Sequence, residues 1–251
     1  MNSSPAVEKI VFHADSLRLE GFLHLPPSLP APLVIGSHGM LSDSSSPKQV
    51  ALGQKLAASG VAFFRFDHRG CGHSEGIFRE VTTLEARCRD LLAAEDFLRA
   101  NFDLLPDLGL FGSSLGGTTC IAAAGRLGDR LRVMVCLAAP VRSRPVIEAV
   151  KADGGVAASD IDLLQQRLAF DVTMHLAALR DILVIHGECD EIVPPEHAYA
   201  IYRNAAGHNR LIILPGGDHR VSDPAHQGTV IRESVFWLLS HLKGTAAVSY
   251  K

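Results

Sequence analysis

Six short runs of consecutive apolar residues, spaced by segments long enough for helices, constrain this chain more than any other feature. The runs are Leu33–Ser37, Val61–Phe66, Leu108–Phe111, Val133–Ala138, Ile182–His186 and Arg210–Leu214. Strands that are apolar on both faces have to be covered on both faces, which is typical of parallel sheets. Segments of helical length lie between and after the runs, at Pro47–Ser59, Leu84–Asn101, Leu115–Leu127, Pro195–Ala206 and Asp223–Leu242. This alternation predicts a three-layer α/β domain with a mostly parallel sheet.

Two further segments precede these runs and have a different pattern. Val7–Ala14 and Leu17–Leu25 alternate apolar and polar residues, as half-buried antiparallel strands do. They predict an N-terminal antiparallel hairpin that completes an eight-stranded sheet. Residues 141–180 are too long for a simple crossover and predict a short helical cap insertion. Because no repeat and no linker rich in Gly, Ser or Pro occurs, residues 1–251 are expected to form a single domain.

The composition excludes several classes of protein. With 47% hydrophobic residues the chain can build a sizeable core, which excludes a disordered protein. A net charge of −3 without a basic run gives no reason to expect nucleic acid as a partner. No apolar run approaches the roughly 20 residues that cross a bilayer, so no membrane insertion is expected. The five cysteines form no CxxC pair, which argues against a disulfide framework and a zinc site. The N-terminus has no secretory pattern, so a cytoplasmic location is expected.

The strongest local signal is the pattern Gly-x-Ser-x-Gly at residues 112–116. It follows an expected strand directly and precedes an expected helix, which is the context that this motif requires. A tight turn of this kind exposes a serine, and the amides at the start of the next helix stabilise negative charge that develops there. Ser114 is therefore the candidate nucleophile.

A serine nucleophile needs a base, and the base needs a carboxylate that orients it. Carboxylates follow the run Ile182–His186 at the end of the strand where ligands bind in open α/β sheets. Asp190 is the candidate acid. Glu188 and Glu191 are its neighbours, and they are interpreted as solvated loop charges.

The base has to be chosen among 12 histidines. His219 follows the last apolar run on a glycine-rich loop, so it emerges at the same edge of the sheet as the candidate acid. The chain order Ser114, Asp190, His219 is the order of nucleophile, acid and base in α/β-hydrolases. His186, at the end of a strand, is interpreted as a structural hydrogen-bonding residue.

Five motifs in chain order resemble those of the α/β-hydrolase superfamily. They are Ser37-His38-Gly39-Met40, the Asp67–Gly76 loop, the Ser114 turn, His186-Gly187-x-x-Asp190 and Gly217-Asp218-His219. The resemblance extends from about residue 20 to residue 243, and within the superfamily it is to the compact esterases, serine-aminopeptidase-like and dienelactone-hydrolase-like enzymes. It implies the three-layer α/β-hydrolase fold, but none of these motifs specifies a substrate.

The resemblance also implies an oxyanion hole made of the backbone amides of Met40 and Leu115. Each such amide donor contributes on the order of 3 kcal/mol to the stabilisation of a transition state. The Asp67–Gly76 loop resembles a structural loop beneath the active site. No residues suggest a metal site, and no nucleotide-binding glycine pattern follows a strand, so no cofactor is expected.

The leading functional hypothesis is a serine hydrolase that cleaves a carboxylic ester of small to medium acyl size through an acyl-serine. Thioesterase and amidase or aminopeptidase activities use the same residues and stay open. An aminopeptidase needs an acidic group for the free amine, and the candidates for it are Asp43, Glu75 and Asp160. A non-catalytic binding protein on the same fold is the remote alternative. The expected partner is a small-molecule ester, and a homodimer stays open.

The insertion offers apolar side chains that can line an acyl pocket. They are Val141, Val146, Ile147, Val150 and Leu163. The alternative interpretation is that these side chains only pack helices against the edge of the sheet.

Overall fold

The computed structural model describes residues 5–40, 42–153, 162 and 165–243. Its centre is one sheet of eight strands in the order β1-β2-β4-β3-β5-β6-β7-β8. The strands are β1 (Ala6–Ala14), β2 (Leu17–Leu25), β3 (Ala31–Ser37), β4 (Ala62–Phe66), β5 (Leu104–Ser113), β6 (Leu131–Leu137), β7 (Ile182–Gly187) and β8 (Arg210–Leu214). β1 and β2 pair antiparallel, β2 pairs antiparallel with β4, and all other neighbours are parallel. The predicted mostly parallel sheet with an N-terminal hairpin is thus confirmed.

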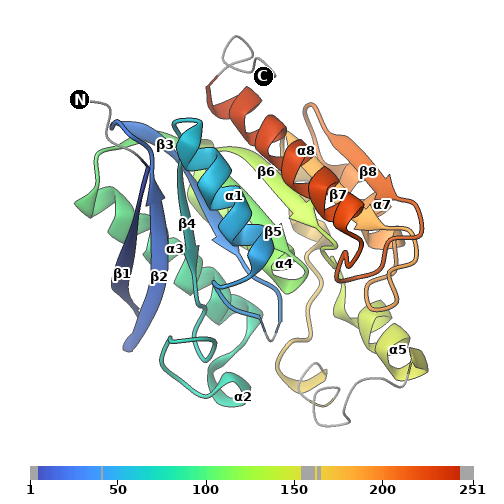
Figure 1. Cartoon of the computed structure of the whole chain (residues 1–251). Helices are drawn as coiled ribbons and strands as arrows, with labels where there is room; N and C mark the ends of the chain where they lie inside the picture. Colours follow the sequence, from blue (N-terminus) through green and yellow to red (C-terminus); the bar gives the residue numbers. More distant parts are fainter. Residues whose placement is uncertain (1–4, 41, 154–161, 163–164, 244–251) are drawn as a thin grey trace.

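Helices cover both faces of the sheet. They are α1 (Pro47–Ala58), α2 (Phe78–Val81), α3 (Leu84–Asn101), α4 (Leu115–Leu127), α5 (Ser143–Asp153), α7 (Glu196–Asn204) and α8 (Pro224–Leu242), with 3-10 turns at η1 (Gly128–Arg130) and η2 (Thr173–Ala178). Helices α1 and α8 lie in front of the sheet in Figure 1, and α3 and α4 lie behind it. The predicted three-layer α/β architecture is therefore confirmed.

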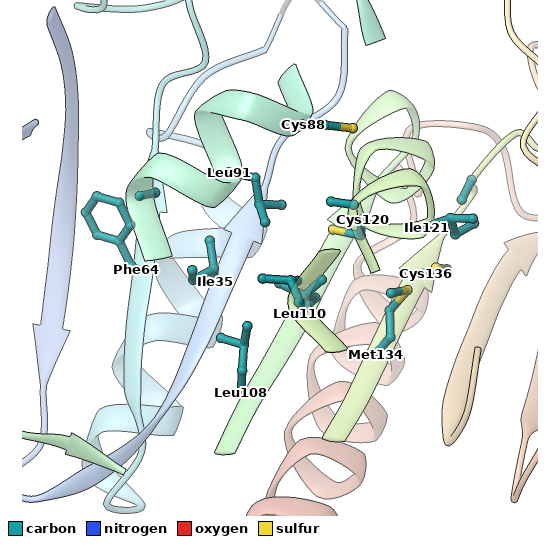
Figure 2. Packing of buried hydrophobic residues seen from close by; sticks show 14 of the residues in the cluster. Ile35, Phe64, Cys88, Leu91, Leu108, Leu110, Cys120, Ile121, Met134 and Cys136 are labelled. Carbon is teal, nitrogen blue, oxygen red and sulfur yellow. The ribbon is translucent and has the colours of Figure 1, made fainter. Parts of the chain in front are cut away.

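The two-residue repeat of the strands explains the two cores. In β6, Val133 and Val135 pack with residues of α1 and α8, while Met134 and Cys136 pack with residues of α3 and α4. Figure 2 shows this second core, where Leu91 of α3 lies over the sheet. Both faces of a central strand are buried, which is why its sequence is continuously apolar.

The cysteines behave as apolar side chains in this core. All five are free, and only Cys189 is exposed. Cys88 and Cys120, on α3 and α4, lie in the core of Figure 2.

The segment between β6 and β7 contains α5 and η2. Its two ends are tied together, because Ser143 N donates to Phe170 O at 3.0 Å and Val172 N donates to Val141 O at 2.9 Å. The segment therefore leaves the sheet and returns to it at one place. Within the described residues, no helix is both long enough and apolar enough to cross a membrane.

Candidate active site

Ser114 lies at the sharp turn between β5 and α4. Its backbone has a φ of 52° and a ψ of −125°, which is strained for a residue other than glycine. The turn is possible because its neighbours lack side chains: a Cβ on Gly112 would lie 2.5 Å from Gly117 Cα, and a Cβ on Gly116 would overlap Ser37 O. The flanking glycines thus let the strand and the helix meet with the serine at the tip.

The structure brings the three predicted residues together. His219 Nε2 lies 3.2 Å from Ser114 Oγ, and His219 Nδ1 lies 2.8 Å from Asp190 Oδ2. Ser114 follows β5, Asp190 follows β7 and His219 follows β8, so three strand ends at one edge of the sheet supply the side chains. A serine, an imidazole and a carboxylate in this line can pass a proton from the hydroxyl to the ring.

The Asp190 carboxylate is buried but well supplied with donors. Oδ1 accepts hydrogen bonds from Ile192 N at 3.0 Å and Val193 N at 2.7 Å, and Oδ2 lies 3.2 Å from His186 Nε2. Burial by itself raises the pKa of Asp190, but the hydrogen bonds from His186 and His219 outweigh burial and hold that pKa well below its ordinary value. Asp190 therefore stays ionised.

His186 is placed as the sequence suggested, as a buried hydrogen-bonding residue. Its Nε2 donates to Val193 O at 2.8 Å, which requires the proton on that nitrogen. The ring thereby braces the turn that carries Asp190.

Glu188 and Glu191 are exposed loop carboxylates, as interpreted from the sequence, and each also accepts a backbone hydrogen bond. Glu191 Oε2 accepts a hydrogen bond from His219 N at 3.1 Å, and Glu188 Oε2 accepts one from Gly216 N at 2.9 Å. Both carboxylates are exposed, yet they tie the loop after β7 to the loop that carries His219. Spacing along the chain does not reveal such ties, because the two loops are brought together only by the pairing of β7 with β8.

The two predicted oxyanion residues also lie at the serine. β3 and β5 are sheet neighbours, with Ser37 opposite Gly112, so the turn at Gly39 and Met40 comes beside Ser114. A Cβ on Gly39 would lie 3.3 Å from Ser114 Cβ. Leu115 is the first residue of α4, and its N–H therefore has no acceptor within the helix.

A buried polar network supports the turn from below. His38 Nε2 accepts a hydrogen bond from His68 N at 3.1 Å, and Ser37 Oγ lies 2.9 Å from His68 Nε2. Burial, followed by the charge of Arg87, holds the pKa of both histidines well below the ordinary value. Neutral rings of this kind can both accept and donate, and they link β3 to the end of β4.

The network ends on Asp90 of α3. His68 Nδ1 lies 3.3 Å from Asp90 Oδ2, and Arg69 donates to the same carboxylate through N at 3.0 Å and through Nε at 2.8 Å. Burial raises the pKa of Asp90 above its ordinary value. The sequence interpretation missed these residues, although a buried Asp at a core-facing helix position is a signal in itself.

The Asp67–Gly76 loop acts as scaffold. Asp67 Oδ1 accepts a hydrogen bond from Ser44 N at 2.6 Å, and Oδ2 accepts one from His73 N at 2.9 Å. One carboxylate thus joins this loop to the segment that follows Met40.

Apolar side chains of the insertion lie against the oxyanion residues. Ile147 and Leu168 form a buried cluster with Leu115, and Met40 packs against it. Val146, the residue before Ile147, packs instead with Val193 beside the Asp190 turn.

The other candidates for an acyl pocket are not part of that cluster. Val141 belongs to the core beneath the sheet, as the alternative interpretation had it. The side chains of Val150 and Leu163 lie outside the described residues.

The acidic residues considered for an amine site are engaged elsewhere. Asp43 Oδ1 accepts hydrogen bonds from Ser45 N and Ser45 Oγ, at 2.7 and 2.5 Å. Glu75 Oε2 accepts one from Arg18 N at 2.8 Å. Asp160 lies outside the described residues. Within the described part of the chain, no group of three or more His, Cys, Asp or Glu side chains is arranged to hold a metal ion.

The fold and the serine turn define a hydrolase of the α/β-hydrolase superfamily. A family model described as serine aminopeptidase, S33, matches residues 29–168, which is more than half of the chain. The protein belongs to this family.

Curated relatives include hydrolases and proteins without an assigned activity. The chain is 29% identical over 244 residues to the uncharacterized protein YfhR of Escherichia coli K12, covering 94% of this chain and 82% of the relative. It is 24% identical over 263 residues to a monoacylglycerol lipase of Mycolicibacterium smegmatis, covering 86% and 91%.

Solved structures of esterases share the fold. Est1E of Butyrivibrio proteoclasticus, determined with ferulic acid, has a TM-score of 0.77 at 22% identity, over 92% of this chain and 98% of that one. The esterase Pf2001 of Pyrococcus furiosus has a TM-score of 0.79 at 17% identity, over 95% and 92%. At such identities the likeness is one of fold.

Proposed function

We propose that the protein is a serine carboxylesterase that cleaves esters of small to medium, apolar acyl groups. The observation that carries the proposal is the hydrogen-bonded line from Asp190 through His219 to Ser114, at 2.8 and 3.2 Å. The similarity to a monoacylglycerol lipase supports an ester as the substrate.

In the first half of the proposed reaction, Ser114 Oγ attacks the ester carbonyl while His219 Nε2 accepts the hydroxyl proton. Asp190 keeps the Nδ1 proton of His219 in place and stabilises the imidazolium that forms. The carbonyl oxygen becomes an oxyanion that accepts hydrogen bonds from the amides of Met40 and Leu115. The imidazolium then gives its proton to the leaving alcohol, and the acyl group stays on Ser114.

In the second half, His219 takes a proton from water, and the resulting hydroxide attacks the acyl-serine carbonyl. The same two amides receive the second oxyanion. Collapse of this intermediate releases the carboxylic acid, and His219 returns the proton to Ser114 Oγ. All steps use side chains and amides of the chain itself, so the proposed reaction needs no cofactor.

The acyl preference of the proposed enzyme follows from the cluster of Ile147, Leu168, Leu115 and Met40. These side chains offer apolar contacts and no charge partner beside the two oxyanion amides. Replacing Ile147 by Ala removes part of this wall, so we expect the ratio of kcat/KM for hexanoyl over acetyl esters to rise about 10-fold. Val146→Ala is the matched control, because Val146 packs on Val193 instead. An unchanged ratio in Ile147→Ala would contradict this assignment.

The aminopeptidase alternative has less support among the described residues, which exclude Asp160. Asp43 already accepts hydrogen bonds from Ser45 in its own loop, and Glu75 accepts one from Arg18 N. The binding-protein alternative gives no reason for a serine, an imidazole and a carboxylate in register.

The test is a panel of p-nitrophenyl esters of graded acyl length, matched thioesters, and aminoacyl p-nitroanilides, with Ser114→Ala as the blank. We expect esters to be cleaved at least 100-fold faster than the anilides. Faster cleavage of anilides with a free amine would establish the aminopeptidase alternative. Thioesters that outpace esters would establish a thioesterase.

A further inference from the structure

Arg87, on α3, is a buried cation with no direct ion pair to a carboxylate of the described residues. Its side chain is fully inaccessible, and its Nη1 has no hydrogen-bond partner. No carboxylate in the described part of the chain forms an ion pair with it, and the nearby Asp90 is engaged by Arg69. Burial lowers the pKa of Arg87, which reflects how poorly the site solvates a charge.

The thiols around Arg87 do not neutralise it either. Cys71, Cys88 and Cys120 are the cysteines whose charges would affect Arg87. Burial raises the pKa of Cys71 to about 11 and that of Cys88 to about 12, and it raises that of Cys120 well above the ordinary value. All three are therefore neutral thiols at physiological pH. A buried charge without an ion pair destabilises the fold, so its position needs a functional or structural reason.

The guanidinium joins the two halves of the proposed oxyanion hole. Its Nη2 donates to the carbonyl oxygen of His38, two residues before Met40. Its Nε donates to Thr119 Oγ1 at 3.3 Å, and this hydroxyl donates to Leu115 O at 2.9 Å. One side of the guanidinium thus holds the residue two before Met40, and the other reaches Leu115 through the Thr119 hydroxyl.

The turn before Met40 and the start of α4 are in close contact. A Cβ on Gly116 would lie 2.6 Å from His38 O and would overlap Ser37 O. The carbonyl that Arg87 holds is therefore one of the two carbonyls against which the start of α4 is packed. The arms of a planar, rigid guanidinium fix the separation of these elements, which a flexible side chain does less well.

We propose that Arg87 is a positioning residue of the oxyanion hole, which holds the amides of Met40 and Leu115 in register and places a positive charge behind the developing oxyanion. The inference rests on the proposed function. Arg87 does not touch the substrate. A fixed charge in a site without water stabilises negative charge more strongly than the same charge in solvent.

The test compares Arg87→Met, Arg87→Lys and Thr119→Val with the control Arg89→Met. Arg89 lies on the same helix but is exposed and pairs with Asp15. We expect kcat to fall roughly 30-fold in Arg87→Met and about 3-fold in Thr119→Val, with KM within 2-fold, because less than one full oxyanion donor is lost. Arg87→Lys keeps the charge but not the fork, and it should lie between them. Arg89→Met should match the wild type.

The decisive readout is the affinity for a trifluoromethyl ketone, which forms an oxyanion on the serine, against that for an ether analogue of the substrate. We expect the ketone affinity to fall in parallel with kcat and the ether affinity to stay constant. Equal losses for both ligands, or no loss in folded Arg87→Met, would overturn the proposal. If both Arg87 variants fail to fold, an unchanged kcat in Thr119→Val overturns it. A wild type that cleaves no ester would instead overturn the proposed function.

Discussion

The two sides of the site are held together in opposite ways. On the oxyanion side, the turn at Met40 rests on His38, His68, Asp90 and Arg87, all of them buried. On the side of the base, the loop that carries His219 is tied through Glu188 and Glu191, both of which face solvent.

This difference has a physical consequence. When a buried polar side chain is removed, the group that it bonded to stays buried without a hydrogen-bond partner or water. The free energy of unfolding therefore falls. Where the partner is exposed, water replaces it, and only the position of the loop suffers. We therefore expect substitutions on the oxyanion side to reduce stability and those on the loop ties to reduce activity slightly.

The largest effect is expected where both sides meet. Ser114→Ala should lower kcat/KM about 10⁵-fold and leave the melting temperature unchanged. Asp190→Asn should lower kcat/KM about 10⁴-fold. Ser113→Ala is the matched control, because this neighbouring serine has no part in the proposed reaction. Esterase activity that survives in purified Ser114→Ala would contradict the proposed role of Ser114 as the nucleophile.

The next effect belongs to the oxyanion side. Asp90→Asn leaves the buried Arg69 and His68 without their carboxylate and should lower the free energy of unfolding by roughly 3 to 5 kcal/mol. Denaturant unfolding measures it. Asp107→Asn breaks an exposed pair with Arg132 and should cost under about 1 kcal/mol. Equal losses of unfolding free energy in Asp90→Asn and Asp107→Asn would contradict the distinction between buried and exposed partners.

The stability of the fold is also expected to depend on pH, because several buried histidines have to stay neutral. Burial, with the charge of Arg65, lowers the pKa of His24 to about 4, and the ring must stay neutral to accept Arg65 Nε–H at 2.9 Å. Between about pH 6.5 and 4 the unfolded chain binds a proton that folded His24 does not, so stability should fall with pH in this window, by roughly 3 kcal/mol from this residue. His38 and His68 act in the same direction.

Asp90 acts in the opposite sense, because its pKa is raised in the folded state. Denaturant unfolding from pH 8 down to 4 measures the sum. His24→Gln should show a shallower decline than the wild type, since its amide does not titrate. Parallel curves for the two proteins would show that the decline arises elsewhere.

The smallest effect is expected on the side of the base. Glu191→Ala removes the acceptor of the His219 N–H, so we expect kcat to fall about 3-fold at constant melting temperature, because the exposed amide gains water in its place. Glu8→Ala, at an exposed position of β1, is the control. A stability loss as large as that of Asp90→Asn would contradict the distinction between buried and exposed ties.

The sequence predicts the fold well because its signals are local. The continuous apolar runs and the Gly-x-Ser-x-Gly turn depend on residues that are close together in the sequence. The chain order of Ser114, Asp190 and His219 depends on the order in which the strands end. The apolar run predicts a start of this strand at Leu108, but β5 begins at Leu104. Pro106 and Asp107 interrupt the apolar pattern there, although Leu104 pairs with Ala31.

The supports of the site could not be predicted in the same way. Arg87 and Asp90 lie among apolar residues on the buried side of α3. The helical pattern of apolar residues does not mark these two positions as buried, and it does not show which residues they contact. Their partners include His38 and His68, which follow β3 and β4, and the pairing of these two strands brings them together. Such networks join segments that are far apart in the sequence, so local sequence patterns do not predict them.

Ser114 is the activated nucleophile of the proposed reaction. The most direct measurement is labelling with a fluorophosphonate, followed by intact mass and peptide mapping of the wild type, Ser113→Ala and His219→Ala. We expect one adduct, on Ser114, in the wild type and in Ser113→Ala, and none in His219→Ala. A folded wild type that takes no label, or takes it on another residue, would contradict this role.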